Sequence, residues 1–143
     1  MPEATRVLML TGQPGSGKTT LAGHIARRLN AVIIDGDALR RYFPADYDTA
    51  GRKANVERAH RTALLIAEQD IDVILAVVQP YADQRNRLKS LGAKEVHLFS
   101  SVPRGRENYF VVDYELPIEP DLILDTGVTD VGSCVEAICA LYR

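Results

Sequence analysis

The sequence predicts an α/β fold in three layers, a five-stranded parallel sheet with helices on both faces. Short apolar runs alternate along the chain with segments of helical periodicity, which is the order typical of a parallel sheet. The run DVILAVVQP at residues 72–80 is rich in β-branched side chains, as in strands buried on both faces. With 143 residues, the chain is expected to form one domain over 1–143 with a sizeable core.

The predicted elements follow in a regular order. Strands are expected at residues 6–10, 31–35, 72–80, 95–101 and 121–127. Helices are expected at 18–30, 51–69, 82–92 and 130–143; in the first, Leu21, Ile25 and Leu29 recur on one helix face. The stretch at about 100–117 fits neither pattern and is long for a connection, so a functional, lid-like loop is predicted there.

The composition limits the partners. The formal net charge of −2 disfavours a broad nucleic-acid-binding face. No apolar run approaches the ~20 residues that cross a bilayer, and the first residues lack a signal pattern, so we expect a cytoplasmic protein without membrane contact. Cys134 and Cys139 are expected to stay reduced and to pack as small apolar side chains.

A phosphate-binding motif follows the first predicted strand. TGQPGSGKTTLA, residues 11–22, contains G-x-x-x-x-G-K-[ST] between a strand and a helix, which indicates a P-loop NTPase fold of the nucleoside/nucleotide kinase type. Its glycines let backbone N–H groups face a phosphate, and the helix N-terminus adds a positive dipole. Lys18 would reach the β- and γ-phosphates and Thr19 would hold Mg²⁺, so ATP and Mg²⁺ are the expected cofactors. The expected ATP-binding residues are Gly12, Gln13, Pro14, Gly15, Ser16, Gly17, Lys18, Thr19 and Thr20.

Two carboxylates follow the second predicted strand. Asp35 and Asp37 lie at the sheet edge where ligands of α/β proteins bind. The third strand ends without an acidic residue, so this pair is the nearest source of a carboxylate for Mg²⁺. We expect Asp35 to hold a Mg²⁺-bound water and Asp37 to orient an acceptor hydroxyl or take its proton. The alternative is that Asp37 only caps the helix that it begins.

Arginines recur around the same edge. Arg40 follows Asp37 by three residues, and Arg52, Asn55 and Arg58 share helical spacing, so they could line an anionic pocket or form a solvated helix face. Arg104 and Arg106 lie in the lid-like loop. Arg104 is expected to carry charge to the transferring phosphoryl group. Aromatic residues that could stack on a base or pack in the core are Phe43, Tyr47 and Tyr81.

Taken together, these motifs resemble those of the adenylylsulfate (APS) kinases. The shared stretches are GSGKTTLA at 15–22, DGDALR at 35–40, RKANVER at 52–58, PYADQR at 80–85 and PDLILDTG at 120–127. The resemblance implies transfer of the γ-phosphoryl group of ATP to the ribose 3′-hydroxyl of adenylylsulfate, a small anionic acceptor. It also implies that the acceptor is bound by Asp37, Arg40, Tyr47 at the place of a stacking phenylalanine, Arg52, Asn55, Pro80, Tyr81 and Arg85.

The chain departs from the family in two places. Gln79 stands where the family usually has serine, and the segment after Ser100 is shorter than the family's lid, where only Arg104 and Tyr109 can be aligned. The residues therefore also fit a kinase for a modified nucleotide, a sugar acid or a polynucleotide 5′-hydroxyl. A nucleotide-binding module without transferase activity stays open as well, as does a homodimer.

Overall fold

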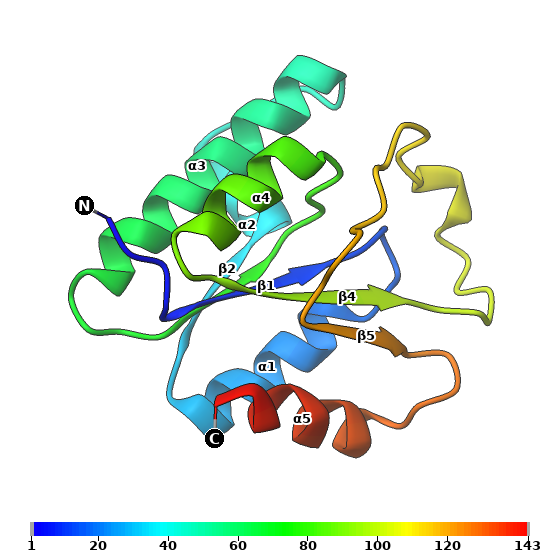
Figure 1. Ribbon diagram of the computed structural model, residues 1–143. Coiled ribbons are helices and arrows are strands. Elements are labelled where there is room, and N and C mark those ends of the chain that lie inside the picture. Colours follow the sequence, from blue (N-terminus) through cyan, green and yellow to red (C-terminus); the bar gives the residue numbers. More distant parts are fainter. Residues whose placement is uncertain (1, 143) are drawn as a thin grey trace.

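A computed structural model describes residues 2–142 and contains the three predicted layers. Across these residues, five parallel strands form one sheet in the order β2-β3-β1-β4-β5. Helices α3 and α4 cover one face of the sheet, and α1 and α5 cover the other (Figure 1). The predicted α/β class with a parallel sheet is confirmed. The strands are β1 (Val7–Thr11), β2 (Val32–Asp35), β3 (Val73–Ala76), β4 (Lys94–Phe99) and β5 (Leu122–Asp125).

The predicted helices are present with different bounds, and the short helix α2 lies between the second strand and the predicted helix at 51–69. The helix α3 begins at Thr49, before the predicted start, because the Asp48 carboxylate accepts a hydrogen bond from the Gly51 backbone N–H at 2.7 Å and caps the helix. The third strand ends early, at Ala76, and the chain then leaves the sheet. The helices are α1 (Lys18–Leu29), α2 (Gly36–Tyr42), α3 (Thr49–Ala67), α4 (Ala82–Ser90) and α5 (Val131–Cys139), with 3₁₀ turns η1 (Glu107–Tyr109) and η2 (Ala140–Tyr142).

The side chains of the central strand β1 alternate between two cores. Val7 and Met9 pack in the core that α3 covers, whereas Leu8 and Leu10 pack in the core under α1 and α5. Every residue of β1 is buried, and so is every residue of β3, which explains why both read as continuous apolar runs. The second core also holds both cysteines, buried and free, as predicted.

The strand order places a crevice at the carboxyl edge of the sheet. The strand β1 lies between β3 and β4, so the chain leaves β1 and β4 toward opposite sides, and ligands of α/β sheets bind at such switch points. The P-loop follows β1 and α2 follows β2, which brings both predicted motifs to this edge. Within residues 2–142, no helix is long and apolar enough to cross a bilayer.

The predicted lid-like loop crosses the same edge. We call residues 101–117 the strap (yellow to orange in Figure 1). The Gln13 side chain donates to the Val111 carbonyl oxygen and accepts from the Val111 N–H, both at 2.9 Å. The Glu115 carboxylate accepts from the Ala82 N–H at 2.7 Å, and Arg104 donates to the Thr126 carbonyl oxygen at 2.7 Å. The strap is therefore fastened to the P-loop, to α4 and to the loop after β5.

Candidate phosphoryl-transfer site

The P-loop has a backbone that needs glycine. A Cβ on Gly12 would lie 2.3 Å from the Leu98 carbonyl oxygen, a distance that no side chain could adopt. Gly17 precedes α1 with φ at +100°, a left-handed conformation that favours glycine. These positions turn the chain so that the helix N-terminus opens toward the edge of the sheet, which is the geometry of an anion site.

Lys18 lies under this loop. Its Nζ donates to the carbonyl oxygens of Gly12 and Gln13, each at 2.9 Å, and only 8% of the residue is exposed. Burial lowers the pKa of the Lys18 ammonium to about 8, while Asp35 and Asp37 oppose the shift. A buried ammonium group at the P-loop can pair with the negative oxygens of a polyphosphate.

Asp35 has two roles in the structure. One carboxylate oxygen accepts from the Ala38 N–H at 3.0 Å and caps α2, and the other accepts from the Thr19 hydroxyl at 3.4 Å. The alternative prediction that Asp37 is the cap is therefore wrong: Asp37 lies inside the first turn and faces the cavity described below. The Thr19 hydroxyl and Asp35 carboxylate are hard oxygen donors that fit Mg²⁺. Within residues 2–142, no group of three or more His, Cys, Asp or Glu residues could hold a metal, so such an ion would need phosphate oxygens as well.

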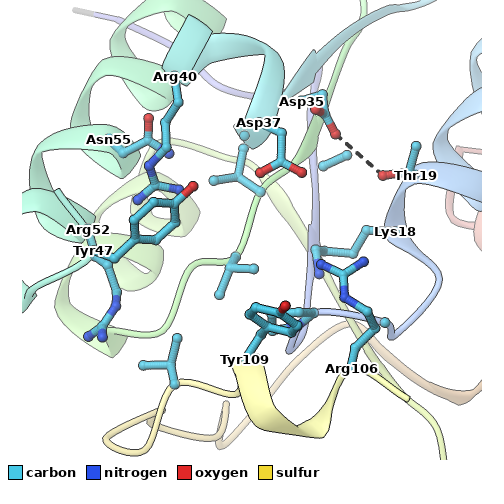
Figure 2. A pocket seen from close by; sticks show the side chains of 17 residues that line it. Lys18, Thr19, Asp35, Asp37, Arg40, Tyr47, Arg52, Asn55, Arg106 and Tyr109 are labelled. Atoms are coloured by element: carbon cyan, nitrogen blue, oxygen red, sulfur yellow. Dashed lines mark hydrogen bonds between the residues drawn. The ribbon is translucent and has the colours of Figure 1, made fainter. Parts of the chain in front are cut away.

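A cavity of about 600 Å³ opens beside the P-loop (Figure 2). It joins many of the residues that the sequence predicted, although they come from the P-loop, from α1, α2 and α3, and from the segments between these helices. It also takes in Arg106, Tyr109 and Val111 of the strap. The predicted residues that line it are Pro14, Gly15, Lys18, Thr19, Asp35, Asp37, Arg40, Tyr47, Arg52 and Asn55.

Two polar atoms in the cavity wall lack partners. Arg40 Nε and Asn55 Oδ1 are buried without a hydrogen bond to any residue in the part of the chain that the structure describes. The Arg40 guanidinium carbon lies 4.0 Å from the centre of the Tyr47 ring, and Asn55 is 2% exposed. Buried polar groups are normally satisfied, so an unpartnered donor and an unpartnered acceptor on two residues of one cavity wall point to a polar ligand.

Three predicted acceptor-binding residues do not line the cavity. Arg85 is 1% exposed; its guanidinium contacts Glu95 at 3.2 Å and donates to the carbonyl oxygens of Gln79 and Glu115 at 2.6 and 2.5 Å. Tyr81 donates its hydroxyl to Asp113 of the strap at 3.2 Å. Pro80 is buried, and its carbonyl oxygen accepts from the Glu115 N–H at 2.7 Å. The PYADQR stretch thus supports the strap, and Pro80, Tyr81 and Arg85 themselves do not line the cavity.

The two strap arginines lie in different places. Arg106 lines the cavity, and Figure 2 shows its guanidinium beside Lys18. Arg104, the predicted catalytic arginine, instead bonds to Thr126 and lines a smaller cavity of about 250 Å³ across the P-loop. Gly105 separates them with φ at +77°, a turn that sends adjacent side chains apart. This glycine is the sequence signal that could have separated their roles.

Gln79, one of the two places where the sequence departs from the resembled pattern, does not line the cavity. Its Oε1 lies 2.6 Å from His60 Nε2 on α3, and both side chains are buried. Burial lowers the pKa of His60, so the ring is neutral and donates this bond at neutral pH. The pair fixes the segment after β3 against the helix that carries Arg52 and Asn55. A contact between residues this far apart leaves no local pattern in the sequence.

Comparison with known proteins identifies the family of the chain. The family model described as adenylylsulphate kinase matches residues 4–105. The adenylyl-sulfate kinase of Geotalea daltonii is 30% identical over 166 aligned positions, which cover 96% of this chain and 82% of that protein. The crystal structure of APE1195 superposes with a TM-score of 0.84 at 28% identity and covers 99% of this chain and 96% of that one. The Mycobacterium tuberculosis APS kinase CysC, solved with AMPPNP and APS, shares the fold with a TM-score of 0.80 at 22% identity, over 99% of both chains.

Proposed function

Because the chain belongs to the adenylylsulphate kinase family, we propose that it transfers the γ-phosphoryl group of ATP to the ribose 3′-hydroxyl of adenylylsulfate. The observation that carries this proposal is the cavity beside the P-loop. Its wall includes Asp37 together with Arg40, which has an unpartnered guanidinium N–H, and Asn55, which has an unpartnered amide oxygen. Such a wall suits an acceptor with an anionic group and hydrogen-bond donors.

The P-loop would hold ATP. Backbone N–H groups of residues 15–19 and the Lys18 ammonium would contact the phosphates, and Lys18 would leave the carbonyl oxygens that it now contacts. Thr19 and Asp35 would hold Mg²⁺, directly or through water, and the ion would neutralise charge on the β- and γ-phosphates. Arg106 would reach the transferring phosphoryl group from the strap, in the role that the sequence assigned to Arg104.

Asp37 and the arginines would position the acceptor. The 3′-oxygen attacks the γ-phosphorus while the bond to the β,γ-bridging oxygen breaks, and the hydroxyl proton passes to the Asp37 carboxylate. ADP and the 3′-phosphorylated acceptor are the products. Arg40 and Arg52 would bind the anionic group, and the Asn55 amide oxygen would accept a hydrogen bond from the acceptor. Tyr47 would stack on the base, with Tyr109 on the strap wall of the same cavity (Figure 2).

The cavity distinguishes this acceptor from the alternatives. Its charged lining is richer in Lys and Arg than in Asp and Glu, which favours a small anion. Two tyrosines on the same lining favour a base over a sugar acid, which has no aromatic face. A module that only binds nucleotides would not need Asp37 and Asn55 in the wall of the cavity beside the P-loop.

The test is ADP release with Mg·ATP and adenylylsulfate, combined with identification of the phosphorylated product by mass spectrometry. Gluconate and a 5′-hydroxyl oligonucleotide serve as competing acceptors, and Lys18→Ala serves as the inactive control. We expect turnover with adenylylsulfate at least tenfold above the others, since a site that pairs buried polar groups discriminates strongly. Equal ADP release with and without any acceptor would identify a simple ATPase.

The remaining expectations concern the surroundings of the enzyme. We propose that it acts in the cytoplasm, where ATP is supplied, and that it binds neither nucleic acid nor membrane, in keeping with the net charge of −2. A homodimer is tested by light scattering at several concentrations, and a constant mass of 15.8 kDa would exclude it.

A further inference from the structure

The guanidinium of Arg52 does not point into the centre of the cavity. Figure 2 shows it directed away from Asp37 and Arg40, toward the strap. Its Nη1 donates to the Tyr81 hydroxyl at 3.1 Å and lies 3.5 Å from the Asp113 carboxylate. The Tyr81 hydroxyl in turn donates to the same carboxylate at 3.2 Å. The strap thus offers an anion to a cavity-lining arginine.

The backbone holds Asp113 at this place. Two residues before it, Val111 forms both hydrogen bonds with the Gln13 side chain. Two residues after it, Glu115 bonds to the backbone of Pro80 and of Ala82 and to the Arg85 guanidinium. Asp113 is therefore held between two fixed points, which keep its carboxylate beside Arg52, a residue of the cavity lining.

Asp113 and an anionic acceptor would compete for one cation. The side chain of Arg52 is 25% exposed, and that of Asp113 is 54% exposed. An ion pair of this exposure contributes about 0.2–1 kcal/mol, which corresponds to a roughly 1.5- to 5-fold change in a competing equilibrium. The contact is strong enough to tune affinity and weak enough for a ligand to displace.

We infer that Asp113 is a specificity-determining residue of the acceptor site: it holds the Arg52 guanidinium away from the centre of the cavity, directly and through Tyr81, and so weakens the site for anionic acceptors. An acceptor anion must exchange with the Asp113 carboxylate, and Asp113 takes Arg52 back when the product leaves. The inference rests on the proposed function only for the name of the acceptor, because the competition for Arg52 concerns any anion of suitable size.

The test compares Asp113→Asn with Glu119→Gln in the full chain. The control removes the same charge from a neighbouring carboxylate; the contact of Lys89 there is with the Glu119 backbone oxygen. Inorganic sulfate is titrated while NMR follows the Arg52 Nε–H signal, and adenylylsulfate binding is measured by calorimetry without ATP. We expect Asp113→Asn to tighten both by about 1.5- to 5-fold, whereas Glu119→Gln changes neither.

An Arg52→Gln background decides whether the effect is local. There, Asp113→Asn should no longer tighten the calorimetric binding of adenylylsulfate. Unchanged or weaker binding in Asp113→Asn, an equal gain in Glu119→Gln, or a gain that persists without Arg52 would each overturn the inference. So would sulfate that leaves the Arg52 signal unmoved. If the wild type neither binds nor phosphorylates adenylylsulfate, the proposed function fails, and the sulfate titration still decides the role of Asp113.

Discussion

Replacing Arg85 tests whether this residue supports the strap or binds the acceptor. Its guanidinium is 1% exposed and contacts the Glu95 carboxylate, which is equally buried, and two carbonyl oxygens. Removing one partner of a buried ion pair costs about 3–5 kcal/mol. Because Lys89 still contacts Glu95 at 3.0 Å, we expect Arg85→Met to fall near the lower limit, about 3 kcal/mol. For a chain of this length, that corresponds to a loss of about 10 °C in Tm.

The assay is urea unfolding followed by circular dichroism, with adenylylsulfate affinity measured on the same samples. Arg87→Met is the matched control, since Arg87 lies on the same helix, pairs with Glu57 and is 58% exposed, and it should cost less than about 1 kcal/mol. The reasoning would be refuted if Arg85→Met unfolded within about 1 kcal/mol of the wild type but lost acceptor binding tenfold or more. Arg85 would then be the acceptor ligand that the sequence predicted.

Three further changes test the site itself. Since burial lowers the pKa of Lys18 to about 8 and only the ammonium attracts phosphates, ATP affinity should fall about tenfold between pH 7 and pH 9, measured by calorimetry; a flat profile would contradict the assigned environment. Asp37→Asn should lower kcat at least a hundredfold with ATP affinity nearly unchanged, because the loss is confined to proton transfer; equal losses in kcat and ATP affinity would make Asp37 a metal or structural residue. Arg106→Ala should slow transfer tenfold or more in single-turnover experiments, whereas Arg104→Ala, outside the large cavity, should slow it less; the reverse order would restore the role predicted for Arg104.

The features that the sequence predicted well are those set by neighbouring residues. The P-loop is recognisable because Gly12, Gly17 and Lys18 meet backbone demands within a few positions of one another. The strands β1 and β3 are recognisable because burial on both faces leaves continuous apolar runs. The cap at Asp48 was missed although its partner Gly51 is only three residues away, since an aspartate in a polar stretch has many uses.

The direction in which each arginine points was decided by the tertiary structure. Four arginines follow motifs at the same edge of the sheet: Arg40, Arg85, Arg104 and Arg106. Nothing in their spacing tells which of them binds a ligand and which supports the fold. Arg85 is drawn into the core by Glu95 on β4 and by the Glu115 backbone on the strap, partners that lie 10 and 30 residues away. Arg106 faces the cavity because the strap is fastened through Gln13 and Val111, which are 98 residues apart.

The sequence by itself therefore determined the phosphate cradle, the order of strands and helices, and the set of charged residues available at the carboxyl edge. Periodicity and glycine geometry are local, so a single chain read from end to end displays them. Only the tertiary structure decided which arginine and lysine side chains line the ligand cavity and which are paired in the core. That choice depends on the nearest carboxylate and on the water that packing excludes, and both are set by contacts between distant segments.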